Sequence, residues 1–114
     1  MAYARVTPRA RQGTTGINVE QDVTAGNGVF INPPDRVAAV TIAVHITSSS
    51  GSFTIETSCN RPETLGANAT GGYWDNVYGD GVTLTENTVV MIANAVTGIR
   101  VNCISGAINV AFCG

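Results

Sequence analysis

The sequence has 114 residues, six arginines, no lysine, eight acidic residues and a formal net charge of −2. This length suits one domain that can bury a core without disulfide staples. It holds thirteen glycines and no segment with sustained helical periodicity, which excludes a mainly helical fold. No basic apolar leader and no run of about 18 apolar residues is present, so neither secretion nor a membrane span is expected.

Residues 1–27 lack strong periodicity and predict an extended N-terminal arm before a sandwich domain at residues 28–114. Arg5, Arg9 and Arg11 make this arm basic, whereas the rest of the chain has three arginines and eight acids. Such an arm can dock on an acidic protein surface. Three arginines without interleaved aromatic residues are weak evidence for nucleic-acid binding, which is therefore not expected, and a solvated tail is an equal alternative to a docking arm.

Short apolar segments separated by glycine-rich turns predict seven or eight strands in the rest of the chain. The longest, at 37–46, should be central, and 53–57 should form a hairpin with it. Residues 59–72 read as a long surface loop. Further strands are expected at 28–32, 73–78, 82–85 and 89–93, with a turn at 79–81. The pattern predicts an all-β fold, a single antiparallel β-sandwich of jelly-roll or immunoglobulin-like type.

The C-terminal segment, TGIRVNCISGAINVAFCG, alternates with period two on both sides of Ser105-Gly106. This pattern predicts a hairpin with a two-residue turn, because that register places only apolar residues opposite one another on one face. The expected pairs are Cys103 with Ile108, Val101 with Val110, and Ile99 with Phe112.

The three cysteines, Cys59, Cys103 and Cys113, do not form a recognisable framework. The hairpin separates Cys103 from Cys113 by roughly 17 Å, whereas a disulfide needs Cα atoms within about 7 Å. No CxxC pair or His-Cys cluster indicates zinc. We expect three free thiols that act as small hydrophobic residues.

Catalytic signatures are absent from the sequence. The sole histidine, His45, lies mid-strand on the predicted polar face with no nucleophile pattern beside it. Asp75, Asn76 and Asp80 carry oxygen ligands that calcium could use, but the EF-hand spacing is missing and turn chemistry explains them better. The sequence therefore predicts no catalytic residues, no metal and no cofactor.

Three of the seven aromatic side chains fall within six residues, at Tyr73, Trp74 and Tyr78. Strand alternation would place Trp74 and Tyr78 on one face and Tyr73 on the other. One face would pack in the core. The other could stack on a sugar ring or anchor a protein partner.

The segments SGSFTIETSCNRPE, YWDNV and NAVTGIRVNCISGAINVAF, within about residues 50–112, resemble a pattern of small β-sandwich virion proteins of tailed bacteriophages. The resemblance implies a capsid decoration or cement protein, a head fibre or a tail accessory, usually homo-oligomeric (dimer or trimer) and without enzymatic activity. It further implies docking on the major capsid protein or another virion protein, and location in the virion after synthesis in the host cytoplasm.

Two functions follow as expectations. The first is a virion decoration protein whose Arg5, Arg9 and Arg11 dock on the assembled head. The alternative is a carbohydrate-binding or host-attachment module that uses Tyr73, Trp74 and Tyr78.

Overall fold

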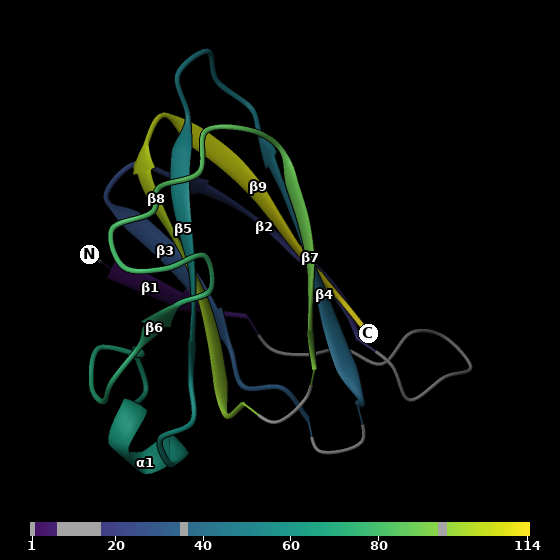
Figure 1. Cartoon of the computed structure of the whole chain (residues 1–114), viewed down its shortest axis with the longest axis vertical. Helices are drawn as coiled ribbons and strands as arrows, with labels where there is room; N and C mark the ends of the chain where they lie inside the picture. Colours follow the sequence, from purple (N-terminus) through teal and green to yellow (C-terminus); the bar gives the residue numbers. More distant parts are fainter. Residues whose placement is uncertain (1, 7–16, 35–36, 94–95) are drawn as a thin grey trace.

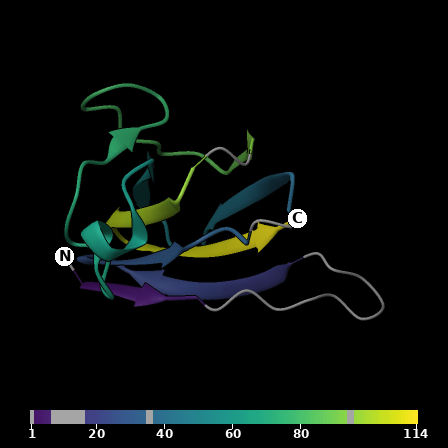
Figure 2. The ribbon, with the colours of Figure 1, turned by 90° about the horizontal axis from the view of Figure 1, so that it is seen from below.

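Two β-sheets packed face to face form the protein in the computed structural model, which describes residues 2–6, 17–34, 37–93 and 96–114. The predicted all-β sandwich is confirmed. Figures 1 and 2 show the two layers from directions 90° apart, with one short helix at an end of the sandwich. Every strand pair is antiparallel except β1 with β3, which run parallel.

The chain supplies strands to a five-stranded and a four-stranded sheet. The five-stranded sheet has the order β1 (Ala2–Arg5), β3 (Asn27–Ile31), β8 (Gly98–Ser105), β5 (Ser52–Ser58), β6 (Asp75–Asn76). The four-stranded sheet has the order β2 (Asn18–Thr24), β9 (Ala107–Cys113), β4 (Ala39–Ile46), β7 (Thr88–Ala93). The helix α1 spans Pro62–Leu65.

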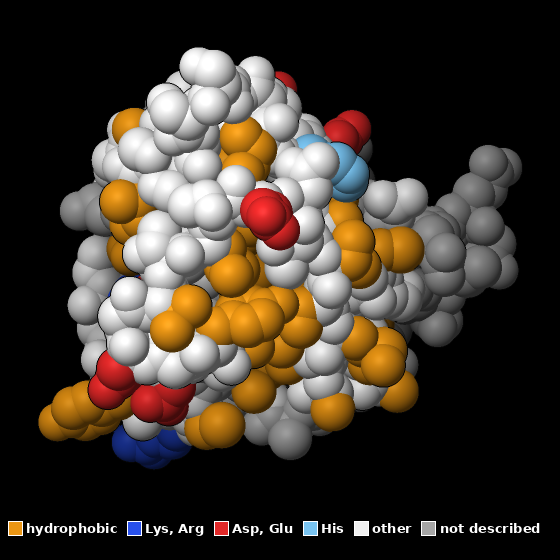
Figure 3. Space-filling model, turned by 45° about the horizontal axis from the view of Figure 1, so that its top comes forward, with side chains coloured by type: hydrophobic (Ala, Val, Ile, Leu, Met, Phe, Trp, Pro, Cys, Tyr) orange, Lys and Arg blue, Asp and Glu red, His pale blue; other side chains and the backbone are white. Residues whose placement is uncertain are grey.

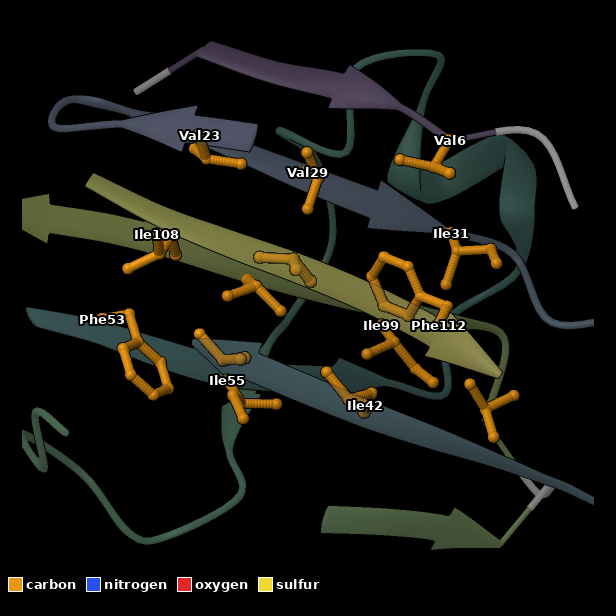
Figure 4. Close-up of a cluster of buried hydrophobic side chains, with 14 of the residues drawn as sticks. Val6, Val23, Val29, Ile31, Ile42, Phe53, Ile55, Ile99, Ile108 and Phe112 are labelled. Carbon is orange, nitrogen blue, oxygen red and sulfur yellow. The ribbon is translucent and has the colours of Figure 1, made fainter. Parts of the chain in front are cut away.

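The core lies between the sheets and is built from alternate residues of the strands (Figure 4). In β4, Val40, Ile42 and Val44 are buried, as the period-two pattern predicts, and β4 lies inside its sheet between β9 and β7. In β5, Phe53 and Ile55 are buried as predicted. Burying a side chain of this size stabilises the fold by about 1.5 to 3 kcal/mol.

The predicted C-terminal hairpin is wrong, because β8 and β9 belong to different sheets. β8 pairs with β3 and β5, and β9 pairs with β2 and β4, so both backbone edges of each strand are occupied. The chain turns through Ser105-Gly106 as expected, but the turn is an arch that carries it across the core. The alternate side chains predicted to pair within one sheet are all fully buried and enter the core from opposite sheets: Ile99, Val101, Cys103, Ile108, Val110 and Phe112.

The predicted hairpin of residues 37–46 with 53–57 is wrong for the same reason, since β4 and β5 lie in opposite sheets. The alternation of apolar and polar residues shows that one face of each strand is buried. It does not show whether the next strand lies in the same sheet, as in a hairpin, or in the opposite sheet, as in an arch, because both arrangements bury the same residues. Of the consecutive strands in the described chain, β5 and β6 alone share a sheet.

The expected N-terminal arm is part of the sandwich wherever the structure describes it. Strand β1 pairs with β3, and β2 pairs with β9 along its whole length, Asn18–Thr24. Val6, Ile17 and Val23 are buried in the core. β2 leaves only a weak pattern in the sequence because it is an edge strand with few buried side chains. Arg9 and Arg11 lie outside the described residues.

Other expectations hold in part. The surface loop at 59–72 contains α1, whose Leu65 is buried. The 73–78 strand is reduced to β6, and 82–85 contributes a single bridge, from Leu84 to Phe53. Cys103 and Cys113 are free thiols, as predicted. The described part of the chain has no helix with the length and hydropathy needed to span a bilayer.

Candidate functional site

Polar and aromatic side chains gather on the outer face of the five-stranded sheet. β8 lies between β3 and β5, and its alternate residues Arg100 and Asn102 point away from the core. The register places Arg100 opposite Glu56 and Asn102 opposite Thr54. We call Tyr3, Glu56, Trp74, Arg100 and Asn102 the Arg100 cluster.

The guanidinium of Arg100 is held from four directions. Its Nε donates to Oε1 of Glu56 at 2.9 Å, and Nη1 donates to the carbonyl of Ala69 at 2.7 Å. The guanidinium carbon lies 4.8 Å from the ring centroid of Tyr3 and 4.3 Å from that of Trp74. Both partners of the ion pair are largely buried, with 14% and 18% of their side chains exposed. Such stacking and pairing fix the loop that carries Trp74 against the sheet.

Asn102 extends the cluster along the neighbouring strand β5. Its Nδ2 donates to Oγ1 of Thr54 at 2.7 Å and also to Oε1 of Glu56. Its Oδ1 is buried and has no hydrogen-bond partner among the described residues. The ring of Tyr3 lies over Gly28, the residue opposite Asn102 on β3, where a Cβ would come within 2.6 Å of the ring.

This packing raises the pKa of the Tyr3 hydroxyl. Burial raises the pKa of the Tyr3 hydroxyl above its ordinary value of 10.0, the positive charge of Arg100 lowers it, and the carboxylate of Glu56 raises it. The phenol therefore stays protonated to a higher pH than an exposed tyrosine does. The contacts of Arg100 with Glu56, Ala69 and the ring of Tyr3 give the cluster the properties of a structural anchor.

The aromatic segment predicted as a binding face is divided by the structure. Trp74 is partly buried on Arg100, and its Nε1 donates to the carbonyl of Gly71 at 2.9 Å. Tyr73 is 84% exposed and Tyr78 is 40% exposed. Since β6 is only two residues long, simple strand alternation does not govern these three side chains.

Arg5, the described member of the predicted docking arginines, is exposed on β1. Its guanidinium donates to Oδ1 of Asn32 and lies 5.6 Å from the ring centroid of Phe30. These contacts hold Arg5 on the sheet.

The candidate metal ligands at residues 75–80 and the candidate catalytic histidine have no functional arrangement in the described structure. Oδ1 of Asn76 accepts from the backbone of Tyr78, and its Nδ2 donates to the carbonyl of Val82, which supports the turn interpretation of this segment. In the part of the chain that the structure describes, no three His, Cys, Asp or Glu side chains are grouped to hold a metal. His45 is exposed on β4, opposite Asn109 of β9.

An apolar edge that the sequence reasoning missed lies on the other sheet. β7 is an edge strand that pairs with β4 along one side. Its outward residues Val89 and Met91 are 68% and 69% exposed, and Val90 and Ile92 pack only partly against the core. Figure 3 shows hydrophobic side chains gathered across the middle of one face, with arginine side chains at its lower margin. We call residues 88–93, with the side chains of Val89, Val90, Met91 and Ile92, the open edge.

One signal in the sequence could have located the open edge. Residues 88–93, TVVMIA, contain no charged residue and no proline, although such residues usually protect an edge strand. Recognising the signal requires knowing that β7 is an edge, which depends on the pairing.

No protein-family model, characterised protein or solved structure matches this chain.

Proposed function

We propose that the protein is a non-enzymatic structural protein of a virus particle, a decoration protein that docks on the assembled head of a tailed phage. The open edge carries this proposal. Exposed Val89 and Met91 on an uncharged edge strand form a surface suited to protein association, and water is a poor environment for them. The resemblance of residues 50–112 to small virion proteins indicates which kind of assembly is involved.

The charge distribution suggests how the protein docks. Half of the arginines lie in the first eleven residues, whereas the remaining chain is acidic. Arg5 is exposed on the five-stranded sheet, and the open edge belongs to the four-stranded sheet, so the two surfaces can act separately. Contact of these arginines with acidic groups on the major capsid protein or another virion protein would be screened by salt.

Particle association is the direct test. Particles from the source culture are purified by density, and the protein is sought in the particle band. Particles from a strain lacking the gene are then incubated with recombinant protein at low and high salt. We expect binding that weakens with salt and with the double substitution Arg9→Gln and Arg11→Gln. Arg61→Gln, at an arginine side chain 86% exposed, is the matched control and should bind normally. Absence from particles would refute the proposal.

A carbohydrate-binding role is the second candidate, favoured by the 84% exposure of Tyr73 beside the anchored Trp74. An exposed aromatic ring beside a fixed one can stack on a sugar ring. A glycan array would test it, with Tyr73→Ala expected to abolish any signal and Ile104→Ala, at another exposed side chain, to retain it. A signal that Tyr73→Ala leaves unchanged would exclude this segment.

A further inference from the structure

The four sheet edges of the described chain differ in how they are protected. β1 carries Arg5 and is four residues long, and β6 has two residues, one of them Asp75. β2 carries Glu20 and Asp22. Short length and charge are the usual means by which an edge avoids pairing with another chain. β7 has six residues and neither protection, and within the described residues it pairs on one side only, with β4.

β7 is complementary to itself. In an antiparallel pair centred on Val90, each residue lies opposite the residue of the second copy that is equally far from position 90 on its other side. The two residues of such a pair differ by an even number of positions, so they lie on the same face, and core-facing residues meet core-facing residues. Val89 then lies opposite Met91 of the second copy, and Val90 lies opposite Val90. Apolar cross-strand pairs of this kind stabilise a sheet.

The charges also favour a second copy at β7. The chain has a net charge of −2, so two copies repel weakly overall, and a pair formed through β2 would bring Glu20 and Asp22 close to their equivalents. A pair formed through β7 places no like charges opposite one another within residues 88–93. On the outward face, Thr41 and Ala43 of β4 lie beside β7, and Ala111 and Cys113 of β9 lie one strand further away. All four residues are small and uncharged.

We propose that β7 pairs with β7 of a second copy across a two-fold axis at Val90, joining two four-stranded sheets into one of eight strands. This inference rests on the proposed function, since it makes the open edge the lateral contact between copies on a particle. One strand pair buries less than the roughly 1,200 to 2,000 Å² of a standard stable interface. The dimer is therefore weak in solution, with a Kd between about 10 µM and 1 mM, and is strengthened where many copies are held together.

Sedimentation of the full chain from about 10 µM to 1 mM tests the dimer. We expect a reversible rise from monomer to dimer mass. Met91→Lys should remain monomeric throughout, because it places a charge opposite Val89 in each half of the pair. Ile104→Lys is the matched control, since Ile104 is an exposed apolar residue, 47% exposed, on the other sheet. A wild-type protein that stays monomeric at 1 mM, or a Met91→Lys variant that dimerises equally well, would overturn the proposal.

Cysteine cross-linking tests the register, in a Cys59→Ser background because Cys59 is exposed. A Val90-centred pair brings the two copies of residue 90 within disulfide range, whereas the two copies of residue 89 are about 8 Å apart at Cα. Val90→Cys should give a covalent dimer under mild oxidation and Val89→Cys should not. Cross-linking at 89 but not at 90 would refute the proposed axis.

A dimer that never enters particles would refute the proposed function alone, and particle binding by a strict monomer would refute this inference alone.

Discussion

At the scale of single residues, Arg100 connects the outer face of a sheet to the loop that covers it. Its guanidinium contacts Glu56 on a neighbouring strand, the backbone of Ala69 and the ring of Trp74. A buried carboxylate that loses its cation pays the cost of desolvation without an attraction to offset it. The ion pair between Arg61 and Glu63, by contrast, is 4.0 Å long and almost fully exposed.

We therefore expect Arg100→Ala to lower the free energy of unfolding by about 2 to 4 kcal/mol, because it leaves the largely buried Glu56 carboxylate without its cation. Arg61→Ala should change it by less than about 0.5 kcal/mol, since exposed ion pairs contribute little. Urea unfolding of the two variants beside the wild type measures both values. Equal, small effects would show that the Arg100 cluster does not stabilise the fold.

Tyr3 gives the fold a pH dependence at alkaline pH. Because burial raises its pKa in the folded state above 10.0, its contribution is complete below pH 10 and is lost as pH rises through the folded-state pKa. We expect the wild type to lose more stability between pH 8 and pH 11 than Tyr3→Phe. Urea unfolding at both pH values compares them, and equal losses would mean that Tyr3 ionises as freely in the folded chain as in the unfolded one.

At the scale of elements, the sequence predicted where strands form better than which strands pair. The alternation at Val40, Ile42 and Val44 predicts β4 correctly, because a strand with one buried face carries apolar residues at every second position. Whether the next strand returns in the same sheet or crosses the core depends on backbone partners far away in the chain. The link between Arg100 and Glu56 was not predictable for this reason, because it requires β5 beside β8.

The arch at Ser105-Gly106 is the element that most constrains the topology. Gly106 has φ +68°, and a Cβ there would lie 2.2 Å from Oγ of Ser48 and 2.8 Å from the Cα of Gly51. Gly81 has a similar φ of +77° but nothing within 4 Å. The two glycines therefore share the conformational constraint and differ in the space around them.

We expect Gly106→Ala to destabilise the protein by about 2 to 4 kcal/mol, through left-handed strain together with overpacking against the 48–51 loop. Gly81→Ala should cost only the strain, about 1 to 2 kcal/mol. Thermal and urea unfolding of both variants separates the two contributions. If the costs are the same, the arch is not packed against that loop.

At the scale of the whole molecule, the chain passes from sheet to sheet at almost every connection, and neighbouring strands within a sheet are distant in sequence. Such non-local pairing links the N-terminal strands to the C-terminal ones: β1 pairs with β3, β3 with β8, and β2 with β9. The N-terminal segment is thus a structural part of the sandwich in its described residues, and its loss has consequences beyond any docking role.

Deleting residues 1–6 tests this integration. Val6 is 9% exposed in the core, Tyr3 covers Gly28 and stacks on Arg100, and β1 satisfies backbone groups of β3. We expect the truncated protein to lose about 2 to 4 kcal/mol of stability through lost apolar burial and hydrogen bonds. Because these contacts are apolar packing, ring stacking and backbone hydrogen bonds rather than ion pairs, the loss should be nearly the same at low and high salt.

Arg5→Gln is the matched control, since it removes the charge and keeps the strand. It should change the free energy of unfolding by less than about 1 kcal/mol, with a small dependence on salt, because an exposed charge contributes little to stability. Unfolding of both proteins in urea at 0.05 M and 1 M salt distinguishes a core strand from a solvated arm. A truncated chain with an unchanged midpoint would mean that β1 rests on the sheet without stabilising it, and that any weaker particle binding after truncation reflects lost docking contacts rather than a damaged fold.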